Sequence, residues 1–143
     1  MNDDWYEREQ LHFAAQDGDI ERVKELIKEG YDINAFDQDL SWTPLHCAAQ
    51  YDHIEVVKYL LSQGADVNAY EEDKIGETPL GQVAEECSYE MAETLIKAGA
   101  DPTIQGWMQL TALYRASKRS NSEGMRVYEL LLKTAKKQLH NHS

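Results

Sequence analysis

The chain has 143 residues, enough for one domain with its own hydrophobic core, and 26 Asp and Glu against 14 Lys and Arg give a formal net charge of −12. This acidity argues against binding to nucleic acid phosphates and to anionic membrane surfaces. No apolar run approaches the roughly 18 residues that a membrane span needs. The first residues lack the basic and apolar segments of a signal peptide, and two cysteines are too few for a disulfide framework, so we expect a cytoplasmic protein.

The predicted elements form a repeat that recurs every 33 to 35 residues along the chain. Residues 11–15 (Leu-His-Phe-Ala-Ala) correspond to residues 45–49, and residues 30–35 (Gly-Tyr-Asp-Ile-Asn-Ala) correspond to residues 64–69. The fourth copy aligns only if about three extra residues enter within 118–124. We therefore predict a single domain over residues 1–143, built from four copies at approximately residues 5–37, 38–72, 73–105 and 106–137.

Each copy predicts a short helix, a turn, a longer helix and an extended loop. Thr43 and Thr78 stand at helix N-cap positions, and each is followed by a proline at the first helical position. Apolar residues then recur at helical spacing, and a glycine at position 30, 64 or 99 ends the second helix. One such helix pair cannot bury its apolar face alone, so we expect the copies to stack into one elongated core.

The residues at 43–46 (Thr-Pro-Leu-His) and at 64–69 (Gly-Ala-Asp-Val-Asn-Ala) resemble the ankyrin repeat. The resemblance implies an all-α solenoid of stacked helix pairs, with hairpin-like loops projecting from one side. The chain departs from the pattern where Glu9-Gln10 replace Thr-Pro, where Gly81 stands in the place of His46, and where Pro102-Thr103 replace Val-Asn. The fourth copy lacks both the proline and the Gly-Ala-Asp segment. Degenerate first and last copies are expected, because they cap the stack. Gly81 lies within a predicted helix, where glycine costs about 1 kcal/mol of stability relative to alanine, so we predict that the third copy is the least stable internal one.

Candidate catalytic and metal-binding residues are few. The resemblance implies that His12 and His46 make hydrogen bonds between turns, and the apolar surroundings of Cys47 predict that it is packed between copies. His140 and His142 could touch a metal ion, although a polar chain end is the preferred interpretation. Motifs for nucleotide, zinc or calcium binding are absent from the sequence, so we expect a protein that is not an enzyme and holds no cofactor.

The same resemblance implies that the loop tips and the exposed ends of the short helices form a concave surface that binds partners. The loop tips are unexpectedly apolar, since turn residues are usually Gly, Asn, Asp or Ser. Trp42 and Leu110 directly precede helix N-caps, so they are either interface anchors or hydrophobic staples. The predicted partner-binding residues are Asp39, Leu40, Trp42, Gln50, Tyr51, Lys74, Ile75, Glu77, Glu85, Glu86, Trp107, Met108 and Lys118.

Aromatic anchors surrounded by carboxylates predict a basic protein partner, and not nucleic acid or a membrane. We expect the chain to be a monomer. A toxin-neutralising inhibitor or immunity protein is one concrete form of this function. A metal- or small-molecule-binding protein and a self-associating protein are the alternatives. The last copy is basic, because residues 111–143 hold seven Lys and Arg against two Glu. The lysines late in the final helix are suited to a helix C-terminus, where positive charge is favourable. Four cations nearer the start of the fourth copy could instead extend the binding surface: Arg115, Lys118, Arg119 and Arg126.

Overall fold

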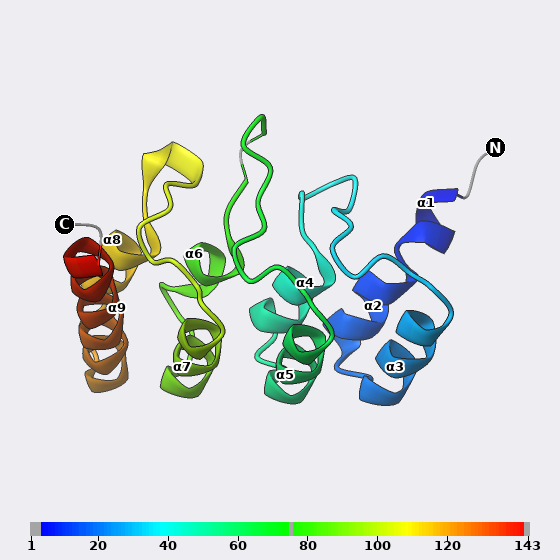
Figure 1. Ribbon diagram of the computed structural model, residues 1–143, viewed down its shortest axis with the longest axis horizontal. Coiled ribbons are helices and arrows are strands. Elements are labelled where there is room, and N and C mark those ends of the chain that lie inside the picture. The colour runs from blue at the N-terminus through cyan, green and yellow to red at the C-terminus, as the bar shows by residue number, and fades with distance from the viewer. Residues whose placement is uncertain (1–3, 75, 142–143) are drawn as a thin grey trace.

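The computed structural model describes residues 4–74 and 76–141, and every regular element in these two ranges is helical. Helix pairs stand side by side along the long axis, and the loops between pairs project from one side (Figure 1). The predicted all-α solenoid is therefore confirmed. The elements are α1 (Asp4–Arg8), α2 (Gln10–Asp17), α3 (Ile20–Lys28), α4 (Pro44–Gln50), α5 (Ile54–Ser62), α6 (Pro79–Val83), α7 (Tyr89–Lys97), the 3-10 turn η1 (Trp107–Gln109), α8 (Ala112–Ser117) and α9 (Ser122–Asn141).

Local side-chain chemistry sets where the helices begin. The hydroxyl oxygens of Thr43, Thr78 and Thr111 accept a backbone N–H at the starts of α4, α6 and α8. In the first copy Glu9 occupies the equivalent position, and α2 has no side-chain cap. The predicted caps at residues 43 and 78 are confirmed, and the missing first cap follows from the degenerate sequence of that copy.

Glycines in the left-handed region end the longer helices as predicted. Gly30, Gly64 and Gly99 have φ of 100°, 97° and 99°, which a residue with a Cβ adopts only under strain. The chain can therefore leave each outer helix abruptly and enter the loop that leads to the next copy. We call these connections loop 1 (residues 29–43), loop 2 (residues 63–78) and loop 3 (residues 98–111).

The core repeats with the sequence. Each outer helix contributes a fully buried leucine, and the inner helices α2, α4 and α6 contribute another. Cys47 is buried between copies, as predicted, and burial raises the pKa of its thiol to about 12, so it stays protonated at neutral pH. The buried leucines are Leu11, Leu26, Leu45, Leu60, Leu80, Leu95 and Leu131.

Asparagine side chains connect successive loops. The Asn34 side-chain oxygen accepts the backbone N–H of Asp66 at 2.8 Å, and Asn68 accepts that of Asp101 at 2.8 Å. The third copy has Thr103 at this position, and no fourth Gly-Ala-Asp segment follows to supply a donor. Pro102-Thr103 therefore replace Val-Asn at the point where these asparagine contacts between loops end.

The ends of the stack differ from the internal copies. The short α1 precedes the first pair and was not predicted, and Trp5 packs edge-on against Phe13 of α2. At the other end α9 has 20 residues, whereas α3, α5 and α7 have nine each. It continues beyond residue 137, where the sequence predicts the end of the fourth copy. None of the helices in the described ranges is both long and apolar enough to cross a membrane.

Candidate functional site

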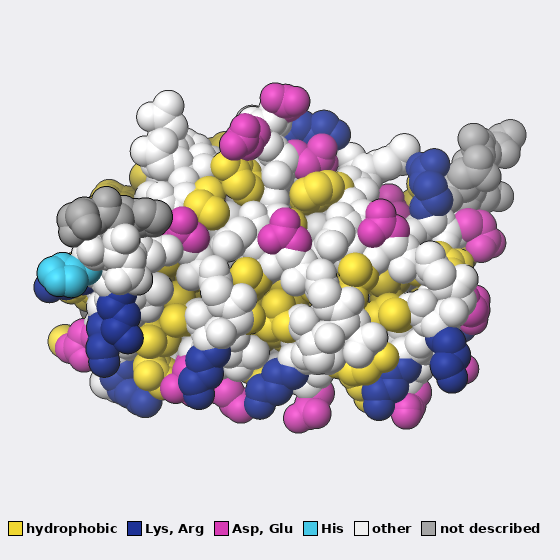
Figure 2. Space-filling view, in the orientation of Figure 1, with side chains coloured by type: hydrophobic (Ala, Val, Ile, Leu, Met, Phe, Trp, Pro, Cys, Tyr) yellow, Lys and Arg dark blue, Asp and Glu magenta, His cyan; other side chains and the backbone are white. Residues whose placement is uncertain are grey.

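The structure arranges most of the predicted partner-binding residues in two exposed groups. We call the first the loop-tip patch, and it contains Asp39, Leu40, Lys74, Trp107 and Met108. The second, the helix-end patch, contains Gln50, Tyr51, Glu85, Glu86 and Lys118. Trp42 and Glu77 are partly buried, and Ile75 lies outside the described residues. Figure 2 shows acidic side chains gathered at the highest loop tip, which belongs to loop 2.

Loop 1 is shaped by one carboxylate. Asp37 accepts the backbone N–H groups of Leu40 at 2.8 Å and Trp42 at 3.2 Å, and this closes a tight turn in which Ser41 has φ of 57°. Leu40 is held at the tip with 55% of its surface exposed. Trp42 instead packs against the hydrophobic core, which supports the staple alternative for this residue.

Histidines attach the first two loops to the inner helices. His12 donates from Nε2 to the carbonyl oxygens of Ala35 at 2.8 Å and Trp42 at 3.0 Å, and His46 donates to that of Glu77 at 2.6 Å. The Nδ1 atom of His46 accepts the backbone N–H of Thr43 at 3.0 Å, which fixes the neutral tautomer. Burial lowers the pKa of His46 to about 4, so this contact carries no charge at neutral pH. The predicted role of both histidines is confirmed.

Among the described loop residues, the most exposed apolar side chain lies in loop 3. Trp107 is 47% exposed and Met108 66% exposed, within the turn η1. Met108 and Gln109 have φ of 58° and 62°, a backbone conformation that is unfavourable for residues other than glycine. The Gly106 N–H donates to the Leu110 carbonyl at 2.9 Å and closes the turn. Such a conformation persists only where surrounding contacts hold it.

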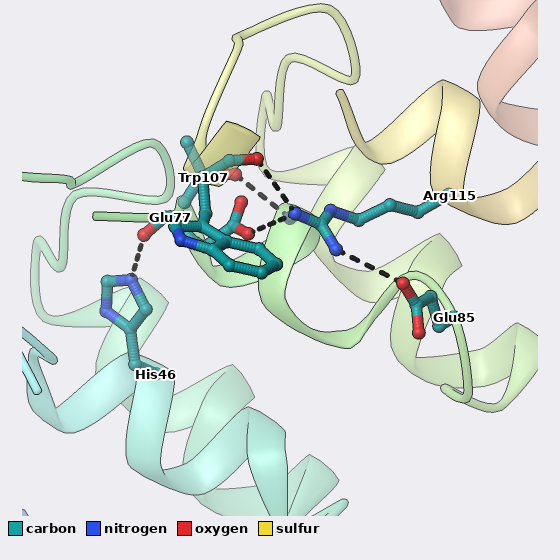
Figure 3. Close-up of polar contacts among 7 residues, drawn as sticks. His46, Glu77, Glu85, Trp107 and Arg115 are labelled. Carbon is teal, nitrogen blue, oxygen red and sulfur yellow. Dashed lines mark hydrogen bonds and ion pairs between the residues drawn. The ribbon is translucent and has the colours of Figure 1, made fainter. Parts of the chain in front are cut away.

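Those contacts come from an ion pair between Glu77 and Arg115 (Figure 3). One guanidinium nitrogen of Arg115, Nη2, donates to the Glu77 carboxylate at 2.5 Å and to the Trp107 carbonyl at 3.2 Å. The other, Nη1, donates to Glu85 at 3.1 Å. Burial raises the pKa of Glu77, and the nearby Arg115 opposes that rise.

Two glycines make room for this ion pair. A Cβ on Gly81 would lie 3.0 Å from the Glu77 carboxylate, and one on Gly106 would collide with it. Gly81 stands at the repeat position that His46 occupies in the second copy. Packing explains why a glycine is present there, because the Glu77 carboxylate occupies the adjacent space. The expectation that Gly81 weakens the third copy stays a prediction, although α6 is the shortest inner helix with five residues.

The hypothesis that four basic residues extend the binding surface is wrong for Arg115 and Arg119, whereas Lys118 and Arg126 are exposed and for them it stays a prediction. Arg115 is buried in the ion pair, with 10% of its side chain exposed, and Arg119 donates to the carbonyls of Ala84 and Cys87 at the end of α6. The Arg126 guanidinium lies 4.1 Å from the centre of the Tyr89 ring. Spacing in sequence could not separate these fold contacts from free cations, because the carboxylates paired with Arg115 and the carbonyls bound by Arg119 lie 30 to 38 residues away.

Two hollows accompany the patches. A groove of about 350 Å³ at the inner-helix ends is lined by Gln50, Asp52, Glu85, Glu86 and Glu123, with other residues, and is strongly acidic. A cleft of about 330 Å³ separates the tips of loops 2 and 3 and is lined in part by Tyr70, Glu72, Gly76, Trp107 and Met108.

Sequence reasoning missed Tyr70 and Tyr114. Tyr70 lines the cleft, and Tyr114 is 48% exposed on α8. Tyr114 stands at the copy position of His46, so the repeat register itself could have identified it. Within residues 4–74 and 76–141 no group of three or more His, Cys, Asp or Glu is placed to hold a metal ion, and His142 lies outside these ranges.

The repeat geometry agrees with comparison to known proteins. A family model described as ankyrin repeats, in three copies, matches residues 11–106, which is more than half of the chain. The matched region covers α2 to α7 and ends within loop 3, so the ion pair of Arg115 joins it to the divergent fourth copy. A search of curated proteins finds no match to this sequence.

Proposed function

Because this chain belongs to the ankyrin-repeat family, whose repeats are generally protein–protein interaction modules, we propose that it binds a protein partner with a basic surface through the loop-tip and helix-end patches. The family is typically non-catalytic, and we propose that this chain also acts by binding alone.

The observation that carries the proposal is the exposed pair Trp107 and Met108 on a backbone that hydrogen bonds hold in place. Large side chains that remain exposed on a rigid turn lose little conformational freedom when a partner covers them. Trp is also among the residues that dominate binding energy at interfaces. A partner would therefore gain most of its affinity at loop 3.

Charge supports the choice of a basic partner. The helix-end groove collects Asp52, Glu85, Glu86 and Glu123, and the tip of loop 2 adds Glu72 and Asp73. Opposite charge on a partner accelerates the encounter and disfavours acidic competitors more than it strengthens the final complex.

Selection from a random peptide display library on the immobilised chain tests the proposal. We expect the enriched peptides to be basic with one or more apolar anchors, and their binding to weaken at least tenfold for Trp107→Ala. Met125→Ala is the matched control, because Met125 is 56% exposed, comparable with the 47% of Trp107, but belongs to α9 and not to a loop. Enrichment of acidic peptides, or equal binding by both variants, would contradict the proposal.

A further inference from the structure

The three loops are attached to the helices in two different ways. Loops 1 and 2 are held by hydrogen bonds from the imidazole rings of His12 and His46 to loop carbonyls. Loop 3 is held by charged groups, because Gly81 replaces the third histidine and the Glu77 carboxylate lies against the space that its side chain would take. The apolar tip of loop 3, with two successive non-glycine residues at positive φ, thus depends on an ion pair.

This ion pair joins two residues that are 38 positions apart in the chain. Glu77 ends loop 2, Arg115 lies in α8, and Trp107 lies at the tip of loop 3. The exposed fractions of the Arg115 and Glu77 side chains are 10% and 18%, so water and salt screen the pair little. The guanidinium fork, unlike an ammonium group, can hold Glu77, Glu85 and the Trp107 carbonyl at once.

The same contacts determine the width of the cleft between the tips of loops 2 and 3. Gly76 of loop 2 and Trp107 of loop 3 both line this cleft. Gly76 precedes Glu77 in sequence, and the Trp107 carbonyl accepts a hydrogen bond from Arg115. A Cβ on Gly106 would meet both the Glu77 carboxylate and the Gly76 carbonyl, so the two loops approach each other closely at this point. A change at the ion pair must therefore change the width of the cleft.

We propose that Arg115, through its ion pair with Glu77, is the positioning residue of loop 3 and sets the cleft in which a basic side chain of the partner binds. The cleft suits such a side chain because it offers the rings of Tyr70 and Trp107 together with the Glu72 carboxylate. The one lysine in its lining, Lys74, is paired with Glu71 at 3.6 Å. This inference rests on the proposed function for the choice of ligand, but the positioning role does not need a partner.

Hydrogen exchange on the free chain tests the positioning role. In Arg115→Met we expect the amide of Gln109 and that of Leu110 to exchange at least tenfold faster, while amides of α4 keep their rates. A 5-fluorotryptophan label should show the Trp107 resonance moving toward its unfolded position, with Trp42 unchanged. Arg115→Lys should behave like Arg115→Met, because a single ammonium group cannot replace the fork.

Arg119→Met is the matched control. Arg119 is also partly buried and also donates to backbone carbonyls, at Ala84 and Cys87, but the structure gives it no contact with loop 3. It should lower the melting temperature without changing exchange at residues 109 and 110. Equal effects of the two variants on loop 3 would show a merely structural role and overturn the proposal.

Binding of the peptide Gly-Ala-Arg-Ala-Gly and of its Arg→citrulline analogue tests the cleft. We expect the arginine peptide to shift the Trp107 fluorine resonance of the wild-type chain at millimolar concentration, and its effect to fall at least fivefold in Arg115→Met. The citrulline peptide keeps the shape without the charge and should have no effect. If exchange changes as expected but neither peptide binds, the positioning role stands and the choice of ligand is wrong. Failure of both readouts overturns the whole inference.

Discussion

At the scale of single residues, His46 makes stability depend on pH. Burial lowers its pKa from 6.5 to about 4, so between these values the unfolded chain binds a proton that the native chain excludes. The free energy of unfolding should therefore fall by about 3 kcal/mol as pH decreases from 6.5 to 4, since one pKa unit corresponds to about 1.4 kcal/mol. Urea denaturation at a series of pH values measures this loss.

The control is His46→Gln, which removes the titrating group. Glu77 acts in the opposite direction, because its raised pKa makes its contribution to stability grow as pH falls. The difference between wild type and variant separates the two effects. Curves that run parallel from pH 7 to pH 4 would show that His46 is not the group responsible.

Trp42 and Trp107 should respond oppositely to truncation. Trp107→Ala should leave the melting temperature nearly unchanged and weaken partner binding by about 2 kcal/mol or more, as for interface hot spots. Trp42→Ala should lower the free energy of unfolding by about 2 kcal/mol, less than the 3–5 of a fully buried ring, because Trp42 packs only partly against the core. Calorimetry and binding titrations of both variants measure this; a large loss of stability in Trp107→Ala would instead assign its ring to the fold.

At the scale of elements, α6 offers a test of why Gly81 is present. Helix propensity alone predicts that Gly81→Ala stabilises the protein by about 1 kcal/mol. The structure predicts a loss of about 1 kcal/mol instead, because the new methyl group would press on a carboxylate that Arg115 holds in place. Equilibrium unfolding decides the sign. In Glu77→Ala the same substitution should recover part of the gain, since the carboxylate is gone and only the Thr78 hydroxyl, 3.1 Å from the new methyl group, still limits the space.

The elements that the sequence predicts correctly are those fixed by local chemistry. The N-caps at Thr43 and Thr78 and the terminal glycines of the outer helices depend on residues within one turn, so the repeat pattern shows them directly. The 3-10 turn at Trp107 was not predictable, because Met108 and Gln109 adopt a conformation that their residue types disfavour. What holds that turn comes from Arg115 and Glu77, 38 residues apart. The glycine at position 81 was the one visible sign of this arrangement.

At the scale of the whole molecule, the charged groups behind the net charge of −12 are unevenly distributed over the surface. Arg115 and Arg119 form an ion pair and hydrogen bonds within the fold, so the basic fourth copy presents fewer free cations than its composition indicates. The helix-end groove, by contrast, brings together four carboxylates from segments up to 71 residues apart. Composition could predict an acidic binding surface, but only the stacking of copies shows where the carboxylates meet.

This charge distribution predicts how association should depend on salt. With a basic peptide selected on the chain, the association rate should fall about tenfold or more between 20 mM and 300 mM salt, because screening removes long-range attraction. The dissociation rate should change much less, since the contacts of Trp107 and Met108 are short-ranged and apolar. The double variant Glu85→Gln, Glu86→Gln should associate more slowly at low salt and show a flatter dependence, measured by stopped-flow fluorescence. Salt that acted mainly on dissociation would show that the carboxylates form close ion pairs in the complex and do not serve chiefly to steer the partner.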